Sequence, residues 1–132
     1  MHNPILIGLL FADKIITENN GKKGIIGTFS IFNGKKFPAV FPPWSLYAGF
    51  TNIEGNHEFA INLVKDDTDQ VVLPLSGNFD SKSLDAVIEL TFTIGGIVFP
   101  GPGVYNLVLS IDGKQVGARI LTVLDATKGV KK

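Results

Sequence analysis

The closing third of the chain carries the pattern that most restricts how it can fold. Between Val98 and Leu124 the sequence reads VFPGPGVYNLVLSIDGKQVGARILTVL. Apolar and polar residues alternate up to Ile111, Asp112-Gly113 follows, and a second apolar run returns. Alternation on both sides of an Asp-Gly pair is typical of a β-hairpin. The pattern predicts a terminal hairpin and carries no information about chemistry.

Short apolar runs recur along the rest of the chain, separated by clusters of Gly, Asn, Asp and Pro. No stretch keeps the i, i+3, i+4 spacing of a helix over three turns, so the chain is predicted to be all-β. We expect an immunoglobulin-like antiparallel β-sandwich of about seven to eight strands. The strands expected before the hairpin cover residues 4–17, 25–33, 46–53, 57–63, 71–75 and 88–94.

Two proline-containing segments mark expected edges of this sandwich. Proline lacks the N–H donor that a central strand needs. The segment KKFPAVFPPW at residues 35–44 is therefore predicted to cross between sheets, and the strand containing Pro74 to lie at a sheet edge. Residues 1–125 are expected to form a single domain, followed by a flexible basic tail at 126–132.

The charge of the chain is sparse and balanced. Charged residues make up 18% of 132 residues, and 12 basic side chains cancel 12 acidic ones. A chain without net charge has little electrostatic attraction for nucleic acid or anionic membrane and little self-repulsion. The expected partner is therefore a second copy, as a homodimer or higher oligomer, or another protein, with no nucleic acid and no membrane. The chain has no cysteine, so disulfides and thiolate chemistry are excluded.

The apolar run ILIGLLFA at residues 5–12 needs an assignment. No Lys or Arg precedes it and no small-residue cleavage pattern follows, so a buried first strand is favoured over a secretion signal. The run is also too short to span a bilayer. Cytoplasmic localisation follows as the default expectation, and export is not excluded.

Few residues offer catalytic chemistry. The only histidines are His2 and His57, which makes a multi-histidine metal site or a Ser-His-Asp triad unfavourable. The turn containing Asp66, Asp67 and Asp69 brings three carboxylates together but lacks the spacing of a calcium loop. A solvated turn is favoured there, with a weak cation site as the alternative. We therefore expect no enzyme activity and no cofactor.

Aromatic residues near the proline segment form the candidate ligand or partner surface. Trp44 and Tyr47 are the side chains best placed for an exposed platform, with Phe41 and His57 as further candidates. Packing in the core or at its edge is favoured for these rings, because large rings usually bury most of their area, and the exposed platform is the alternative. The expected function is a non-enzymatic binding or assembly module that self-associates. The alternative is a sandwich that binds a small ligand such as a carbohydrate through Trp44 and Tyr47.

Four blocks of the sequence resemble a bacterial family of small uncharacterised domains. They read LLFADKIITENNGKKGIIGTF, FP…FPPWSLYAGF, GNHEFAINLVKDD and FPGPGVYNLVLSIDGKQVGARILTV. The last block also looks like the closing hairpin of many immunoglobulin-like and fibronectin-like modules. The resemblance implies a β-sandwich of unknown function, and it brings no catalytic residues to this chain.

Overall fold

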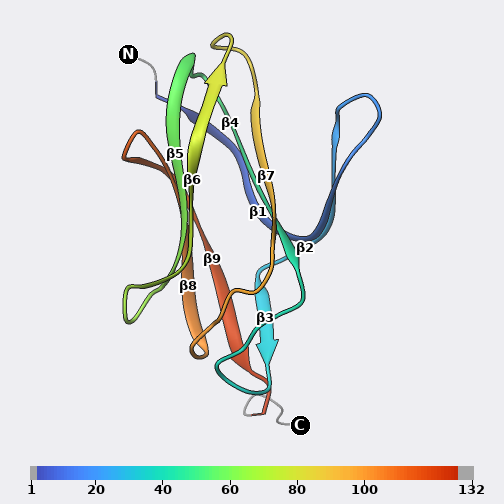
Figure 1. Ribbon diagram of the computed structural model, residues 1–132, viewed down its shortest axis with the longest axis vertical. Helices are drawn as coiled ribbons and strands as arrows, with labels where there is room; N and C mark the ends of the chain where they lie inside the picture. Colours follow the sequence, from blue (N-terminus) through green and yellow to red (C-terminus); the bar gives the residue numbers. More distant parts are fainter. Residues whose placement is uncertain (1–2, 128–132) are drawn as a thin grey trace.

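Nine β-strands in two sheets make up the fold, seen in a computed structural model that describes residues 3–127. The all-β prediction is confirmed, with one strand more than expected. The strands, shown in Figure 1, are β1 (Ile5–Thr17), β2 (Lys23–Phe29), β3 (Ile31–Gly34), β4 (Trp44–Thr51), β5 (Gly55–Lys65), β6 (Gln70–Ser81), β7 (Ile88–Ile94), β8 (Gly103–Ile111) and β9 (Lys114–Asp125). Within the described residues no helix is long and apolar enough to cross a membrane.

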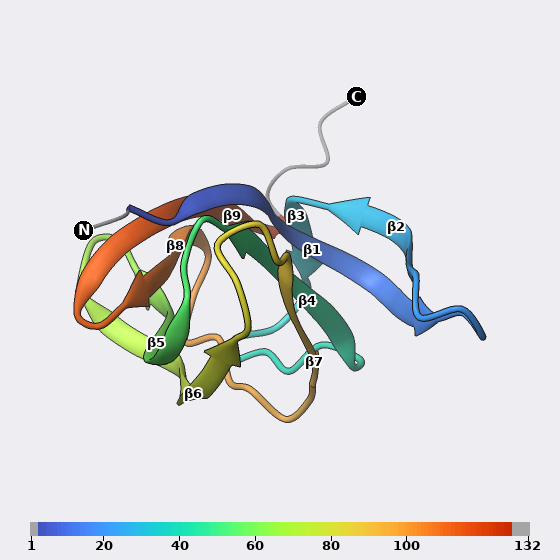
Figure 2. The ribbon, with the colours of Figure 1, turned by 90° about the horizontal axis from the view of Figure 1, so that it is seen from above.

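The two sheets differ in size and shape. One has four strands in the order β2-β1-β4-β7, and the other has five in the order β3-β9-β8-β5-β6. Seen from above, the larger sheet curls toward β1, so that β9 and β1 run beside each other (Figure 2). The fold is thus two facing sheets with one curled into a half-barrel.

The terminal hairpin predicted from the sequence is confirmed. Strands β8 and β9 pair antiparallel from Gly103–Val123 to Ile111–Lys114. Both turn residues have positive φ, 51° at Asp112 and 82° at Gly113. Two consecutive turn residues with positive φ form the kind of turn whose twist matches that of the two flanking strands.

The strand expected over residues 25–33 is wrong in one respect, because it breaks at Ser30. Strand β2 pairs with β1, whereas β3 pairs parallel with β9 in the other sheet, so the sandwich is not purely antiparallel. The backbone carbonyl of Ser30 accepts a hydrogen bond from the Thr122 N–H at 2.9 Å and fixes this corner. The corner lets Phe29 and Phe32 both reach the core, with their ring centroids 4.7 Å apart.

The two proline segments lie at positions where no backbone N–H is needed to pair with a neighbouring strand. Strand β6, which contains Pro74, is the edge of the larger sheet, as predicted. It extends to Ser81, although the sequence predicted a strand only over residues 71–75. Residues 35–43 cross from β3 in one sheet to β4 in the other.

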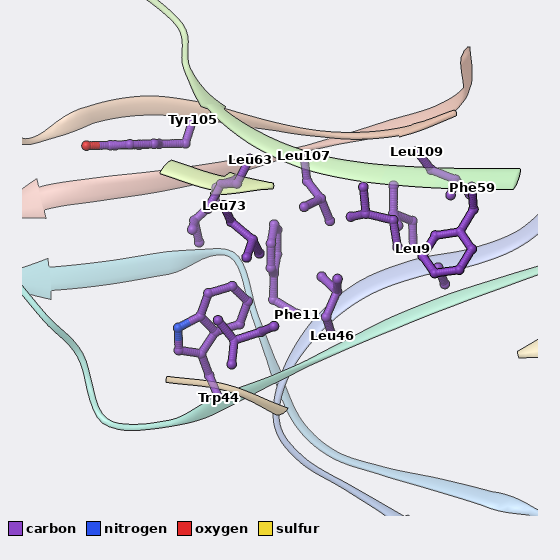
Figure 3. Close-up of a cluster of buried hydrophobic side chains, with 14 of the residues drawn as sticks. Leu9, Phe11, Trp44, Leu46, Phe59, Leu63, Leu73, Tyr105, Leu107 and Leu109 are labelled. Carbon is purple, nitrogen blue, oxygen red and sulfur yellow. The ribbon is translucent and has the colours of Figure 1, made fainter. Parts of the chain in front are cut away.

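The core fills the space between the sheets and contains about twenty buried apolar side chains. Figure 3 shows its centre, where Phe11 and Leu46 from the smaller sheet face Leu63 and Leu107 from the larger one. At the carboxyl end, Ala126 donates a backbone hydrogen bond to Gly34 at 2.8 Å. Strand β9 ends at Asp125, and the division into a domain at 1–125 and a flexible tail at 126–132 stays a prediction. The rest of the predicted tail, residues 128–132, lies outside the described residues.

Candidate functional site

One end of the sandwich contains a pocket of about 1120 Å³. Four segments that are distant in sequence meet there: the residues before β1, the β4–β5 turn, the β6–β7 loop and the β8–β9 hairpin, all at the upper end of Figure 1. The apolar part of its lining consists of Pro4, Ile53, Leu84, Ile111 and Val116. Ile53 and Ile111 are buried, so the apolar lining continues into the core.

A β-bulge brings Val116 to this pocket. Leu109 pairs with Gly117 and Ser110 pairs with Gln115, which leaves Val116 as an extra residue in β9. A bulge of this kind re-aims a side chain and often lies beside a functional site. Here it places a half-buried valine in the pocket lining and against the edge of the core.

The polar rim of the pocket is organised around His57. Its Nδ1 lies 2.6 Å from Asp112 Oδ2, and its Nε2 lies 2.8 Å from the backbone carbonyl oxygen of Glu54. The second Asp112 oxygen accepts the backbone N–H of Glu58 at 3.0 Å. These bonds join the hairpin turn to the start of β5 and to the turn before it. They fix two of the four segments that form the pocket.

The partners of His57 favour its charged form. Both ring nitrogens face acceptors, so only the imidazolium can donate to both. The Asp112 carboxylate, followed by the Glu54 carbonyl, raises the pKa of His57 above its ordinary 6.5. The N–H of Glu58, followed by His57, lowers the pKa of Asp112 below its ordinary 3.8.

This geometry also defines what His57 cannot do. A general base needs a nitrogen lone pair directed toward its substrate. In this structure one ring nitrogen is bonded to Asp112 and the other to a backbone carbonyl. His57 therefore holds the pocket rim in place and has no nitrogen available to accept a proton from a ligand.

We predict that the stability contributed by this pair depends on pH. The raised pKa of His57 means that its contribution is complete below pH 6.5 and is lost as the pH rises through the folded-state value. The lowered pKa of Asp112 means that its contribution is present above pH 3.8 and is lost as the pH falls through its folded-state value. The thermal midpoint of His57→Gln, followed by circular dichroism, should therefore lie below wild type near pH 6. The difference between the two thermal midpoints should become smaller in alkaline buffer.

Asp112→Asn provides the matched variant, because it removes the same bond from the other side. Adding His57→Gln to it should change little further. A gap between wild type and His57→Gln that stays constant across the whole pH range would contradict the role assigned to the pair.

The aromatic surface predicted from the sequence is not exposed at Trp44. That side chain is 3% exposed, and its ring lies within 6.4 Å of the rings of Phe11, Phe29 and Phe32. Phe41 is half-buried and stacks on Phe32, with centroids 4.3 Å apart. A sugar ring cannot stack on faces that other side chains cover, so the carbohydrate platform is corrected to part of the core.

Tyr47 is also buried, on the outer face of the smaller sheet. It is 6% exposed, its ring lies over Gly49, and its hydroxyl donates to Glu89 Oε2 at 2.5 Å. Burial, followed by the hydrogen bond to Glu89, raises the pKa of Tyr47 to about 12. Tyr47 and Trp44 extend to opposite faces of β4, and His57 lies at the pocket. The four predicted residues do not converge on one surface.

The acidic turn between β5 and β6 is occupied by an internal contact. Asp67 accepts a hydrogen bond from Lys65 Nζ at 2.7 Å, and that bond lowers the pKa of Asp67. Asp66 and Asp69 are exposed beside it. Among the described residues no group of three His, Asp or Glu side chains is placed to hold a metal ion. His2 lies outside the described residues.

No sequence pattern indicates the pocket, because the residues that line it are dispersed along the chain. Asp112 and His57 are 55 residues apart, and neither has neighbours that form a motif. Leu84 lies between two expected strands, where no motif marks it, and the extra residue Val116 does not stand out in the apolar run that contains it. The usable signal is the hairpin turn, since an Asp-Gly turn places one carboxylate at the tip.

The fold and the pocket define an all-β domain with a partly apolar pocket at one end. A family model, described as a family of unknown function (DUF6941), matches residues 8–124. The chain therefore belongs to that family, consistent with the resemblance to small uncharacterised domains. No curated protein matches the chain.

Among solved structures, the chain is similar to the Pseudomonas fluorescens alkylpurine DNA glycosylase AlkC bound to DNA containing an abasic site analog. The identity is 8% and the TM-score 0.45, with 88% of this chain and 30% of that chain covered. The expectation that excluded nucleic acid is corrected and withdrawn, because it rested on the net charge alone. Zero net charge fixes only an average and leaves local basic segments such as Lys22-Lys23. At this TM-score the likeness supports no argument about what this chain binds.

Proposed function

We propose that the chain is a non-enzymatic binding module that takes a small, largely apolar ligand in the end pocket. The pocket itself is the observation that carries the proposal. Ligand sites are concave and mostly apolar, with a few polar groups that fix orientation, and have volumes of roughly 300–1,000 Å³. The end pocket has this composition, and its volume of about 1120 Å³ is slightly above that range.

Two further features support binding over catalysis. His57 has no free nitrogen for proton transfer. Within residues 3–127 every buried side-chain N or O atom has a hydrogen-bond partner in the protein, so none is left unpaired for a substrate to bind.

The proposal includes an immunoglobulin-like relationship for the sandwich. Two facing sheets closed by a terminal antiparallel hairpin support this relationship. The curl of the larger sheet and the parallel pairing of β3 with β9 depart from it.

We predict that the fluorescent probe 8-anilinonaphthalene-1-sulfonate binds the native protein in this pocket. Its fused rings suit the apolar lining, and contact with apolar surface raises its emission. Val116→Arg should weaken probe binding about tenfold, because it removes an apolar contact and places a charge in the pocket. A tenfold loss corresponds to about 1.4 kcal/mol of binding free energy. Fluorescence titration measures the affinity.

The matched control is Val104→Arg, which introduces the same side chain at a residue of β8 that does not line the pocket and is 41% exposed. It should bind the probe as wild type does. Circular dichroism confirms that both variants remain folded. Absence of probe binding to wild type, or equal loss in both variants, would refute the proposed function.

A further inference from the structure

We infer that the ligand of the end pocket is a short apolar peptide with both ends free, an inference that rests on the proposed function. Three features of the pocket restrict the ligand: the charges left open at the rim, the size of the apolar lining, and the unpaired backbone beside it.

The rim leaves one negative and one positive side chain open. Four charged residues line the pocket, and two of them, His57 and Asp112, neutralise each other at 2.6 Å. The other two are Glu54 in the β4–β5 turn and Lys114 at the start of β9. Both are exposed, and neither takes part in an ion pair within the described part of the chain. A ligand with one ammonium and one carboxylate group complements both.

The size of the pocket excludes a single amino acid as the best occupant. Its volume of about 1120 Å³ lies above the range of roughly 300–1,000 Å³ that suits drug-sized molecules. One apolar side chain would leave most of the lining uncovered. A peptide of several apolar residues can cover Ile53, Leu84 and Val116 together.

The backbone at the pocket favours a peptide over other zwitterions. Strand β9 pairs with β3 only from Thr122 onward, and within residues 3–127 no strand is paired with its edge at residues 114–116 on the side away from β8. A free strand edge presents N–H and C=O groups to which an extended peptide can bond. Lys114 closes the hairpin against Ile111, so the outward-facing N–H and C=O groups at this end are those of Gln115, which lines the pocket.

The open edge is confined to the pocket end. Further along β9, Leu6 packs on Gly117 so closely that a Cβ there would lie 2.7 Å from Leu6 Cδ2. Arg119 then donates to the Leu9 carbonyl oxygen at 3.3 Å. Strands β1 and β9 therefore close on each other below the pocket, which limits the peptide to a few residues.

The test uses the tripeptide Leu-Leu-Leu as a competitor of 8-anilinonaphthalene-1-sulfonate, in free, N-acetylated and C-amidated forms. Glu54→Gln and acetylation should each weaken binding about two- to fivefold, the size of an exposed ion pair. Lys114→Gln and amidation should do the same. Within each matched pair the second change should add nothing: Glu54→Gln should leave the acetylated peptide unaffected, and Lys114→Gln the amidated one.

Glu18→Gln and Lys36→Gln are the matched controls, because they make the same changes at exposed positions away from the pocket and should leave every affinity unchanged. Equal binding of the free and blocked peptides, or a pocket variant that weakens all three alike, would overturn the inference. Binding of the probe without any peptide competition would also overturn it and leave the proposed function standing. Failure of the wild-type protein to bind the probe at all would refute both the peptide inference and the proposed function.

Discussion

Replacing Phe11 with alanine is expected to lower the free energy of unfolding by about 3–5 kcal/mol, the range found for large aromatic side chains removed from a core. Phe11 is fully buried, at 0% exposure, and its ring contacts those of Phe29 and Trp44 at centroid distances of 5.9 Å. These neighbours are large rings held on strands β2 and β4, on either side of β1 in the smaller sheet, so they cannot collapse freely into the space that the phenyl group leaves. Urea denaturation followed by tryptophan fluorescence measures the change.

Ile7→Ala is the control for this substitution. Ile7 lies on the same strand at a register shift and is 51% exposed, so its loss should change stability by no more than about 0.5 kcal/mol. Equal effects of the two substitutions would mean that the centre of the core is not where Figure 3 places it.

The second large effect is expected at Gly49, where alanine should destabilise the protein by about 1–3 kcal/mol. A Cβ at this position would lie 2.5 Å from the Tyr47 hydroxyl oxygen and 2.8 Å from its ring. The ring cannot move away freely, because its hydroxyl is hydrogen-bonded to Glu89 at 2.5 Å. The same denaturation experiment measures the cost.

Gly8→Ala offers a graded comparison, since its Cβ would approach the same Tyr47 ring only to 3.4 Å. It should cost less than Gly49→Ala. The double variant Gly49→Ala with Tyr47→Ala should be more stable than the sum of the single effects predicts, because the clash disappears. Strict additivity would show that Tyr47 does not lie over Gly49.

Much of the fold follows from the sequence because burial on one face of a strand imposes a period of two. The alternation from Ile88 to Ile94 gives the bounds of β7 directly. Asp112-Gly113 gives the hairpin turn, and Pro74 gives the edge position of its strand. Each of these features is decided by local chemistry, by a donor that proline lacks or by a φ angle that few residues tolerate.

What the sequence could not predict depends on contacts between distant segments. The run at residues 25–33 reads as one strand, yet Thr122 bonds to Ser30 and directs the chain into the second sheet. For Trp44 the sequence favours packing but leaves an exposed position open, and only the contacts with Phe11 and Phe29 in the folded chain decide between them. The pocket combines both difficulties, since its four segments meet only in the folded chain.

The claim that the end pocket is the binding site is tested most directly by mapping where the probe binds. Backbone amide signals of the protein would be followed by two-dimensional NMR while 8-anilinonaphthalene-1-sulfonate is added. We expect the largest changes in amide chemical shift at Ile53, Leu84 and Val116, around the pocket. Shifts concentrated instead at Phe41 and Trp44, or spread over the whole chain, would contradict it.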